Sequence, residues 1–204
     1  MSVLPMVFTS GWASGINAYA VVLLLGLFGR AGVGGEVPEA LQRPEVLIVA
    51  GVLFLCEAVA DKVPYVDTVW DAVHTLVRPA CGAMVGALLA GQSGGSLSEV
   101  AYGAVGGTTA LVMHLVKMST RMAVNTSPEP LSNILLSAAE DLGVAALVVF
   151  ALFHPAVAAG IAGTLLVLGI GTVVVLWRRV RAFRQRRKER KAARREGRTA
   201  EAPA

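Results

Sequence analysis

Two adjacent carboxylates, Glu140 and Asp141, lie near the middle of an apolar stretch that runs from Leu131 to Phe153. A carboxylate at the centre of a membrane-spanning helix costs about 2.5–3.5 kcal/mol to insert. Such residues face the interior of a helix bundle or a water-filled cavity, and they mark functional sites by default. Because adjacent positions point in different directions on a helix, the two carboxylates need different neighbours. One that pairs with a cation stays ionised, whereas one that is only desolvated could take up a proton.

Polar residues recur at spacings of three and four residues on five apolar stretches, so each set occupies one helix face. The sets are Ser10, Ser14 and Asn17; Glu57 and Asp61; Asp67, Asp71, His74 and Arg78; His114, Lys117 and Arg121; and Asn133, Ser137 and Glu140. Each set lies toward the same side of the membrane. We interpret the sets as the lining of a charged cavity that opens to the cytoplasm and reaches about the middle of the bilayer.

Four basic residues of these sets are the expected partners of Glu140 or Asp141, namely Arg78, His114, Lys117 and Arg121. The predicted cavity-lining or substrate-binding residues are Asn17, Asp61, Lys62, Asp67, Asp71, His74, Arg78, His114, Lys117, Arg121, Asn125, Glu129, Asn133, Glu140 and Asp141. The alternative is that these charges form structural ion pairs that hold the helices together. No catalytic residues and no metal ligands are predicted, because no reaction or metal motif is present, and the sequence leaves the cofactor open.

The composition requires a membrane protein around these residues. Hydrophobic residues make up 55% of the 204 positions, charged residues 16%, and the mean hydropathy is +0.64. Soluble domains carry about 25% charged residues. Long, non-alternating apolar runs in lipid predict helices. We therefore expect an all-α bundle of about six transmembrane helices, at Leu4–Phe28, Glu45–Lys62, Ala72–Ala90, Leu97–Met118, Leu131–Phe153 and Ala156–Trp177.

The first stretch contains Ser10, Gly11, Ser14 and Gly15, which suggest a bent or broken start before a firm helix from Ile16. The second and third stretches, and the fourth and fifth, form two hairpins with a loose internal similarity. Small residues at packing spacing, such as Gly82 and Gly86, indicate close helix contacts and are compatible with a homo-oligomer.

Charge is divided between a body and a tail. From Arg178 onward the chain carries twelve Lys or Arg and three Glu. We predict a transmembrane domain over residues 1–178 and a basic cytoplasmic tail over 179–204, helical or disordered. The tail would contact anionic lipid heads of the bilayer, whereas nucleic acid is an unlikely partner. With six crossings, both termini of this multi-pass protein would lie in the cytoplasm of a bacterial plasma membrane.

Several motifs together resemble a bacterial membrane family catalogued as domain of unknown function 4126. They are the segments 14–19 and 60–64, then Asp67, Trp70, Asp71 and His74, then the segment 125–130 with Asn133, Glu140 and Asp141. The resemblance covers about residues 8 to 155. It implies a small polytopic membrane protein and carries no established activity.

Three functions remain open from the sequence. The first is a small transporter or channel-like protein in which Glu140 or Asp141 binds a proton, a small ion or a polar solute. The second is a membrane enzyme that acts on a lipid or lipid-linked substrate, with Lys117 and Arg121 holding a phosphate. The third is a structural or assembly protein. Enzymatic activity is the less favoured expectation, because no assembled reaction motif supports it.

Overall fold

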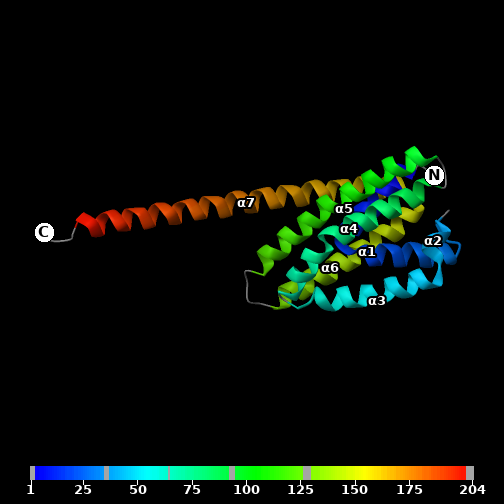
Figure 1. Ribbon diagram of the computed structural model, residues 1–204, viewed down its shortest axis with the longest axis horizontal. Helices are drawn as coiled ribbons and strands as arrows, with labels where there is room; N and C mark the ends of the chain where they lie inside the picture. Colours follow the sequence, from blue (N-terminus) through cyan, green and yellow to red (C-terminus); the bar gives the residue numbers. More distant parts are fainter. Residues whose placement is uncertain (1–2, 35–36, 64, 92–94, 126–129, 201–204) are drawn as a thin grey trace. The chain divides into compact units, whose positions relative to one another are not determined.

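The computed structural model describes residues 3–34, 37–63, 65–91, 95–125 and 130–200. These residues form seven helices and no strand, which confirms the all-α prediction. The helices are α1 (Val3–Arg30), α2 (Glu39–Gln42), α3 (Pro44–Ala60), α4 (Val66–Gly91), α5 (Ser96–Val124), α6 (Pro130–Phe153) and α7 (Pro155–Ala200) (Figure 1). The chain divides into two compact units, Met1–Val167 and Leu168–Ala204. The second unit is the continuation of α7, which is helical through the predicted boundary at residue 178.

Within the part of the chain that the structure describes, four helices are long and apolar enough to cross a membrane, by length and composition. They are Val3–Arg30, Val66–Gly91, Leu131–Phe153 and Pro155–Phe183. Large apolar side chains also cover the exposed face of α3, where Ile48, Val52 and Leu55 are more than half exposed. Such a surface is stable in lipid and costly in water. The chain is therefore an integral membrane protein.

The helix α1 folds back on itself instead of crossing the bundle. Asn17 has φ −147° and ψ 96°, which lie outside the helical range and divide α1 into two halves. Val7 of the first half lies against Gly86, near the end of α4. Tyr19, just after the break, contacts His74 near the start of α4. The second half then returns along α3, so both ends of α1 lie at the same end of the bundle (Figure 1).

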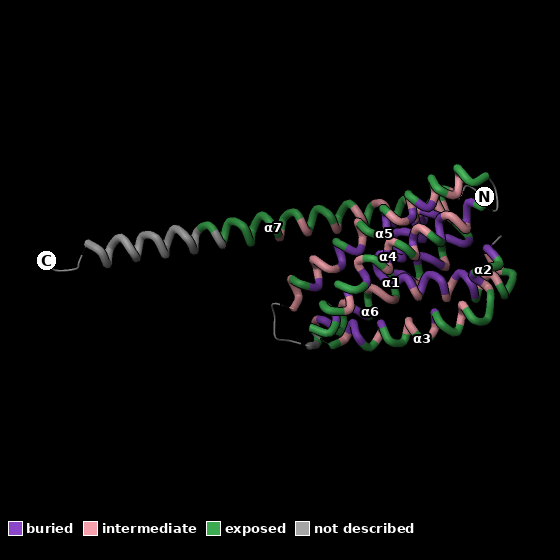
Figure 2. Tube along the Cα trace, in the orientation of Figure 1, coloured by how far each residue is buried: buried purple, intermediate pink, exposed green. Residues whose placement is uncertain are grey.

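The helices α2 to α6 surround α1. In its most apolar window 72% of the residues are buried, against 33% for α4 and 28% for α6, so α1 forms the centre of the bundle (Figure 2). Glycines allow this packing. Gly11 lies against Gly106, and Gly82 lies against the same glycine, so that α1, α4 and α5 meet with their backbones almost in contact. A Cβ atom at Gly82 would lie 2.8 Å from the carbonyl oxygen of Gly106.

Three predicted boundaries differ from the structure. The break in α1 is at Asn17 and not within Ser10–Gly15, because the glycines there serve close contact with α5 and remain helical. The helix α4 begins at Val66, six residues before the predicted start, and α5 continues to Val124. Both extensions carry polar residues that are buried inside the bundle. Hydropathy alone predicts that a helix ends where the apolar residues end. Here α4 and α5 extend further, because the polar faces of their extensions are buried.

Candidate functional site

Eight charged side chains from α3 to α6 and the link after α3 meet near one end of the bundle. We call them the ionic network; they are Glu57, Asp61, Asp67, Asp71, Arg78, Lys117, Arg121 and Glu140. Seven of these side chains are at most 3% exposed, and Glu140 is 14% exposed. The helical spacings that predicted one polar face on each helix are those that bring these residues together.

One part of the network, which we call the balanced cluster, contains Lys117, Arg121, Asp61 and Glu140. The Lys117 Nζ atom lies 2.7 Å from Asp61 Oδ2 and 3.7 Å from Glu140 Oε2. Arg121 Nη2 donates to the same Asp61 oxygen at 3.1 Å and to Glu140 Oε2. Two cations thus face two carboxylates. Paired charges of this kind are tolerated inside a protein, whereas an unpaired one costs several kcal/mol, about 3–5 when a partner is removed.

The other part, which we call the Arg78 triad, contains one cation and two carboxylates. Arg78 Nη2 donates to Glu57 Oε1 at 2.6 Å, and Arg78 Nη1 lies 2.9 Å from Asp71 Oδ1. All three side chains are between 0% and 1% exposed. Glu57 Oε2 and Asp71 Oδ2 are buried without a hydrogen-bond partner among the described residues, and Asp71 Oδ1 has the ion pair with Arg78. The triad therefore carries more negative charge than its guanidinium can neutralise.

His114 lies beside the triad and is neutral. Arg78 Nη1 approaches His114 Nδ1 at 2.6 Å, and a guanidinium can only donate hydrogen bonds. His114 Nδ1 is therefore the acceptor and carries no proton. The other ring nitrogen, Nε2, then donates to Thr75 Oγ1 at 3.1 Å, and that hydroxyl donates to the carbonyl of Asp71. His114 thus adds no positive charge to offset the carboxylates.

His74 of α4 lies between Trp70 of the same helix and Tyr19 of α1. Its Nδ1 atom is 2.7 Å from the carbonyl oxygen of Trp70, so this nitrogen carries the hydrogen. Its Nε2 atom then accepts from the hydroxyl of Tyr19 at 2.9 Å. The indole of Trp70 stacks on the imidazole with ring centroids 4.5 Å apart. The hydroxyl that donates to Nε2, the carbonyl oxygen that accepts from Nδ1 and the stacked ring fix His74 in one orientation between α1 and α4.

Polar residues near the start of α4, the end of α5 and the start of α6 also meet one another and the link after α3. Asn125 Nδ2 lies 3.0 and 2.8 Å from the two carboxylate oxygens of Asp67. Asn133 Nδ2 donates to the carbonyl oxygen of Asp61 at 3.3 Å, and Arg121 donates to the same oxygen at 2.6 Å. The link between α3 and α4 is thus joined to the start of α6. Asp67 is held by neutral donors, with Arg121 3.9 Å away.

The break in α1 is joined directly to the network. Asn17 Oδ1 accepts from the backbone N–H of Ala20 at 2.9 Å, as the N-cap of the second half-helix. The carbonyl of Ile16, released by the break, accepts from Lys117 Nζ at 2.9 Å. Asn17 Nδ2 donates to Asp141 Oδ1 at 3.1 Å. A cation at a helix C-terminus and a carboxylate at a helix N-terminus are both favourable for the helix dipoles.

These contacts show which of the expected partners of Glu140 and Asp141 lie beside them. Glu140 and Asp141 do have different neighbours, as predicted: Glu140 pairs with Arg121 and Lys117, and Asp141 accepts from Asn17. Arg78 and His114, the other expected partners, lie instead with Glu57 and Asp71.

The predicted site residue Lys62 bonds away from the network: it donates to the carbonyl of Ala58 in its own chain segment, 2.7 Å away. Glu129, another predicted site residue, lies outside the described residues. Three residues that the candidate set omitted also contribute: Glu57, Tyr19 and Thr75. Glu57 could have been included, because it lies four residues before Asp61 and is therefore on the same helix face. Tyr19 lies in the motif segment 14–19, and Thr75 lies four residues after Asp71 and three before Arg78, so helical spacing places Thr75 on their face.

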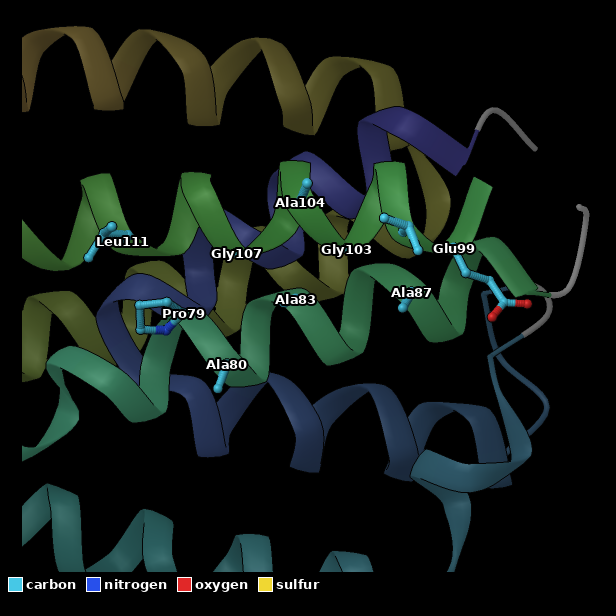
Figure 3. Close-up of a pocket in the computed structure, with 10 residues that line it drawn as sticks. Pro79, Ala80, Ala83, Ala87, Glu99, Gly103, Ala104, Gly107 and Leu111 are labelled. Atoms are coloured by element: carbon cyan, nitrogen blue, oxygen red, sulfur yellow. The ribbon is translucent and has the colours of Figure 1, made fainter. Parts of the chain in front are cut away.

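Within the described residues, no group of three or more His, Cys, Asp or Glu side chains is arranged to hold a metal ion. A surface groove of about 680 Å³ between α4 and α5 lies apart from the network (Figure 3). Small residues such as Ala83, Gly103 and Gly107 line it, and Glu99 lies at one end. The groove is apolar, so the polar chemistry is concentrated in the network and at the α1 break.

No curated protein and no solved structure matches the chain. The sequence profile of one family, described as a domain of unknown function (DUF4126), matches residues 4–176. The match includes α1 to α6, the whole ionic network and the first part of α7. It leaves the basic tail outside. Because the match covers most of the chain, this protein belongs to the DUF4126 family.

Proposed function

We propose that this protein is a small transporter or channel-like protein that moves a proton or small cation through the bundle. The observation that carries the proposal is the broken helix α1, whose two half-helix ends meet buried charged residues at Lys117 and Asp141. Non-helical backbone at membrane depth is tolerated only where protein or a water-filled pathway surrounds it. Discontinuous helices of this kind form the substrate and ion sites of many transporters.

The fold-back of α1 also supports a topology for this proposal. The helices α3 to α7 would cross the membrane and α1 would enter and leave from one side. Five crossings put the basic tail and the network end of the bundle in the cytoplasm, by the positive-inside rule. The N-terminus would then be outside, in contrast to the cytoplasmic N-terminus that six crossings predict. The predicted vestibule would open beside Asp67 and Asn125.

Flux measurements on the purified protein in liposomes test the function. Entrapped pH- and sodium-sensitive dyes would report proton and sodium flux under an imposed ion gradient. We expect flux above that of empty liposomes, and we expect Glu140→Gln to reduce it, since this change removes the carboxylate shared by Arg121 and Lys117. Glu99→Gln, in the surface groove, is the matched control. Wild-type flux equal to that of empty liposomes would exclude the proposal for these ions.

The burial of the network favours a second candidate, a structural role in which ion pairs hold the bundle together. In that case Glu140→Gln would lower thermal stability and no flux would be detected for any variant. The enzymatic alternative predicts a change in lipid composition when the protein is removed from cells, which mass spectrometry of extracted lipids would detect. Among the transport, structural and enzymatic functions, the break in α1 favours transport, because a purely structural ion network does not require a broken helix.

A further inference from the structure

We propose that the Arg78 triad is a proton-binding site, in which Glu57 and Asp71 share one proton while Arg78 neutralises the remaining negative charge. This deepens the proposed function, on which it rests, by naming the ligand and the residues that take it. Three features of the site support the assignment: its charge, its unpaired oxygen atoms and its neighbours.

The charge of the triad requires a positive ligand. Glu57 and Asp71 both contact the same guanidinium, at 2.6 and 2.9 Å, and their side chains are at most 1% exposed. Two carboxylates that share one site cannot both ionise readily, and one of them keeps its proton. Across the network the imbalance is greater, with five carboxylates facing three cations among the described residues.

The unpaired oxygen atoms show where the proton would be held. Arg78 Nη2 donates to Glu57 Oε1, and Arg78 Nη1 donates to His114 Nδ1, so these atoms already have partners. Glu57 Oε2 and Asp71 Oδ2 accept no hydrogen bond from a described residue, and among these residues Asp71 Oδ1 is paired with Arg78 Nη1 alone. A metal ion is a poor alternative occupant, because no suitable group of three ligands was found in the described part of the chain. A proton needs only one of these oxygens.

The neighbours on each side do not supply the missing charge. Lys117 of α5 is 3.7 Å from Glu57 Oε1, but it is committed to Asp61 at 2.7 Å. On α4 and α5, His74 and His114 are held as neutral rings by their hydrogen bonds. From α1, Tyr19 donates its hydroxyl to His74.

One further cation, Arg121 of α5, also interacts with Asp71, but it is engaged with Asp61 and Glu140. The other titratable groups around the triad are the carboxylate of Asp61 and the free thiols of Cys56 on α3 and Cys81 on α4. A proton on the triad is therefore the remaining source of compensation.

Infrared spectroscopy of the full-length protein at neutral pH tests the site without relying on flux. We expect the wild type to show the carbonyl stretch of a protonated carboxyl group. Glu57→Gln and Asp71→Asn should each reduce that band by one carboxyl group, since each leaves one carboxylate for one guanidinium. Glu45→Gln, on the same helix but with a 72% exposed side chain, is the control and should leave the band unchanged.

Thermal unfolding in detergent supplies a second measurement. Each single variant should melt at or above the wild-type temperature, because an amide is isosteric with the neutral carboxyl group that it replaces. The double variant should melt far below it, because Arg78 is then buried with no carboxylate. A wild-type spectrum without the band, or single variants that melt as low as the double variant, would overturn the assignment. Flux without the band rejects this site alone, whereas the band without flux rejects the transport function alone.

Discussion

The balanced cluster, on α5, α6 and the link after α3, lies beside the Arg78 triad, on α3 and α4, and the two differ in charge. Lys117 and Arg121 face two carboxylates, and they also donate to the backbone at Ile16 and Asp61. Arg78 faces two carboxylates alone and donates to a neutral histidine. The comparison separates two uses of buried charge. Carboxylates matched by an equal number of cations, with added backbone contacts, join helices together. A group with more carboxylates than cations is available to bind and release a proton.

The largest effect should come from breaking the balanced cluster. Arg121→Met removes the partner of Glu140 and one partner of Asp61, and it leaves the Asp61 carbonyl with fewer donors. Loss of one member of a buried ion pair costs about 3–5 kcal/mol. We expect a large drop in melting temperature in detergent. Arg43→Met, which removes the exposed partner of Glu45, should change it little; equal melting of the two variants would contradict the structural role.

A smaller effect is expected where the balanced cluster meets the α1 break. Asn17→Ala removes the N-cap of the second half-helix and the bond to Asp141. Loss of such a cap costs about 0.5–2 kcal/mol, and the melting temperature should fall accordingly. Asn17→Asp keeps a capping oxygen but places a carboxylate beside Asp141, so it should be no more stable than Asn17→Ala at neutral pH. Recovery of Asn17→Asp at low pH would confirm the cause.

The smallest effect should be found beside the Arg78 triad. Tyr19→Phe keeps the ring and removes the hydroxyl that donates to His74. A neutral hydrogen bond contributes about 0.5–1.5 kcal/mol, so stability should fall slightly. His74 Nε2 would then be free to accept a proton. Because the wild-type ring is held neutral while the histidine of the unfolded chain takes up a proton, the wild-type melting temperature should fall as the pH falls from 8 to 5, the usual range of histidine, and that of Tyr19→Phe should fall less. A parallel pH profile would show that the hydroxyl does not control this ring.

The sequence predicted much of the network because helical spacing alone puts Asp67, Asp71 and His74 on one face. It did not predict how charge is divided, because the partner of each residue depends on how the helices pack. The reversal at Asn17 was misplaced for a local reason. Gly11 and Gly15 suggested a weak helix, but in a buried helix they permit close contact with α5, and a capping asparagine causes the break.

The break in α1 has a consequence for biosynthesis. The contacts that satisfy it join residues separated by 55, 101 and 124 positions in the chain. The segment that carries the break therefore leaves the ribosome long before Lys117 and Asp141 exist. Until α5 and α6 have been inserted, an uninterrupted helix is the cheaper form of this segment in lipid. The broken form of α1 is thus a late product of assembly, completed only once α5 and α6 have been made.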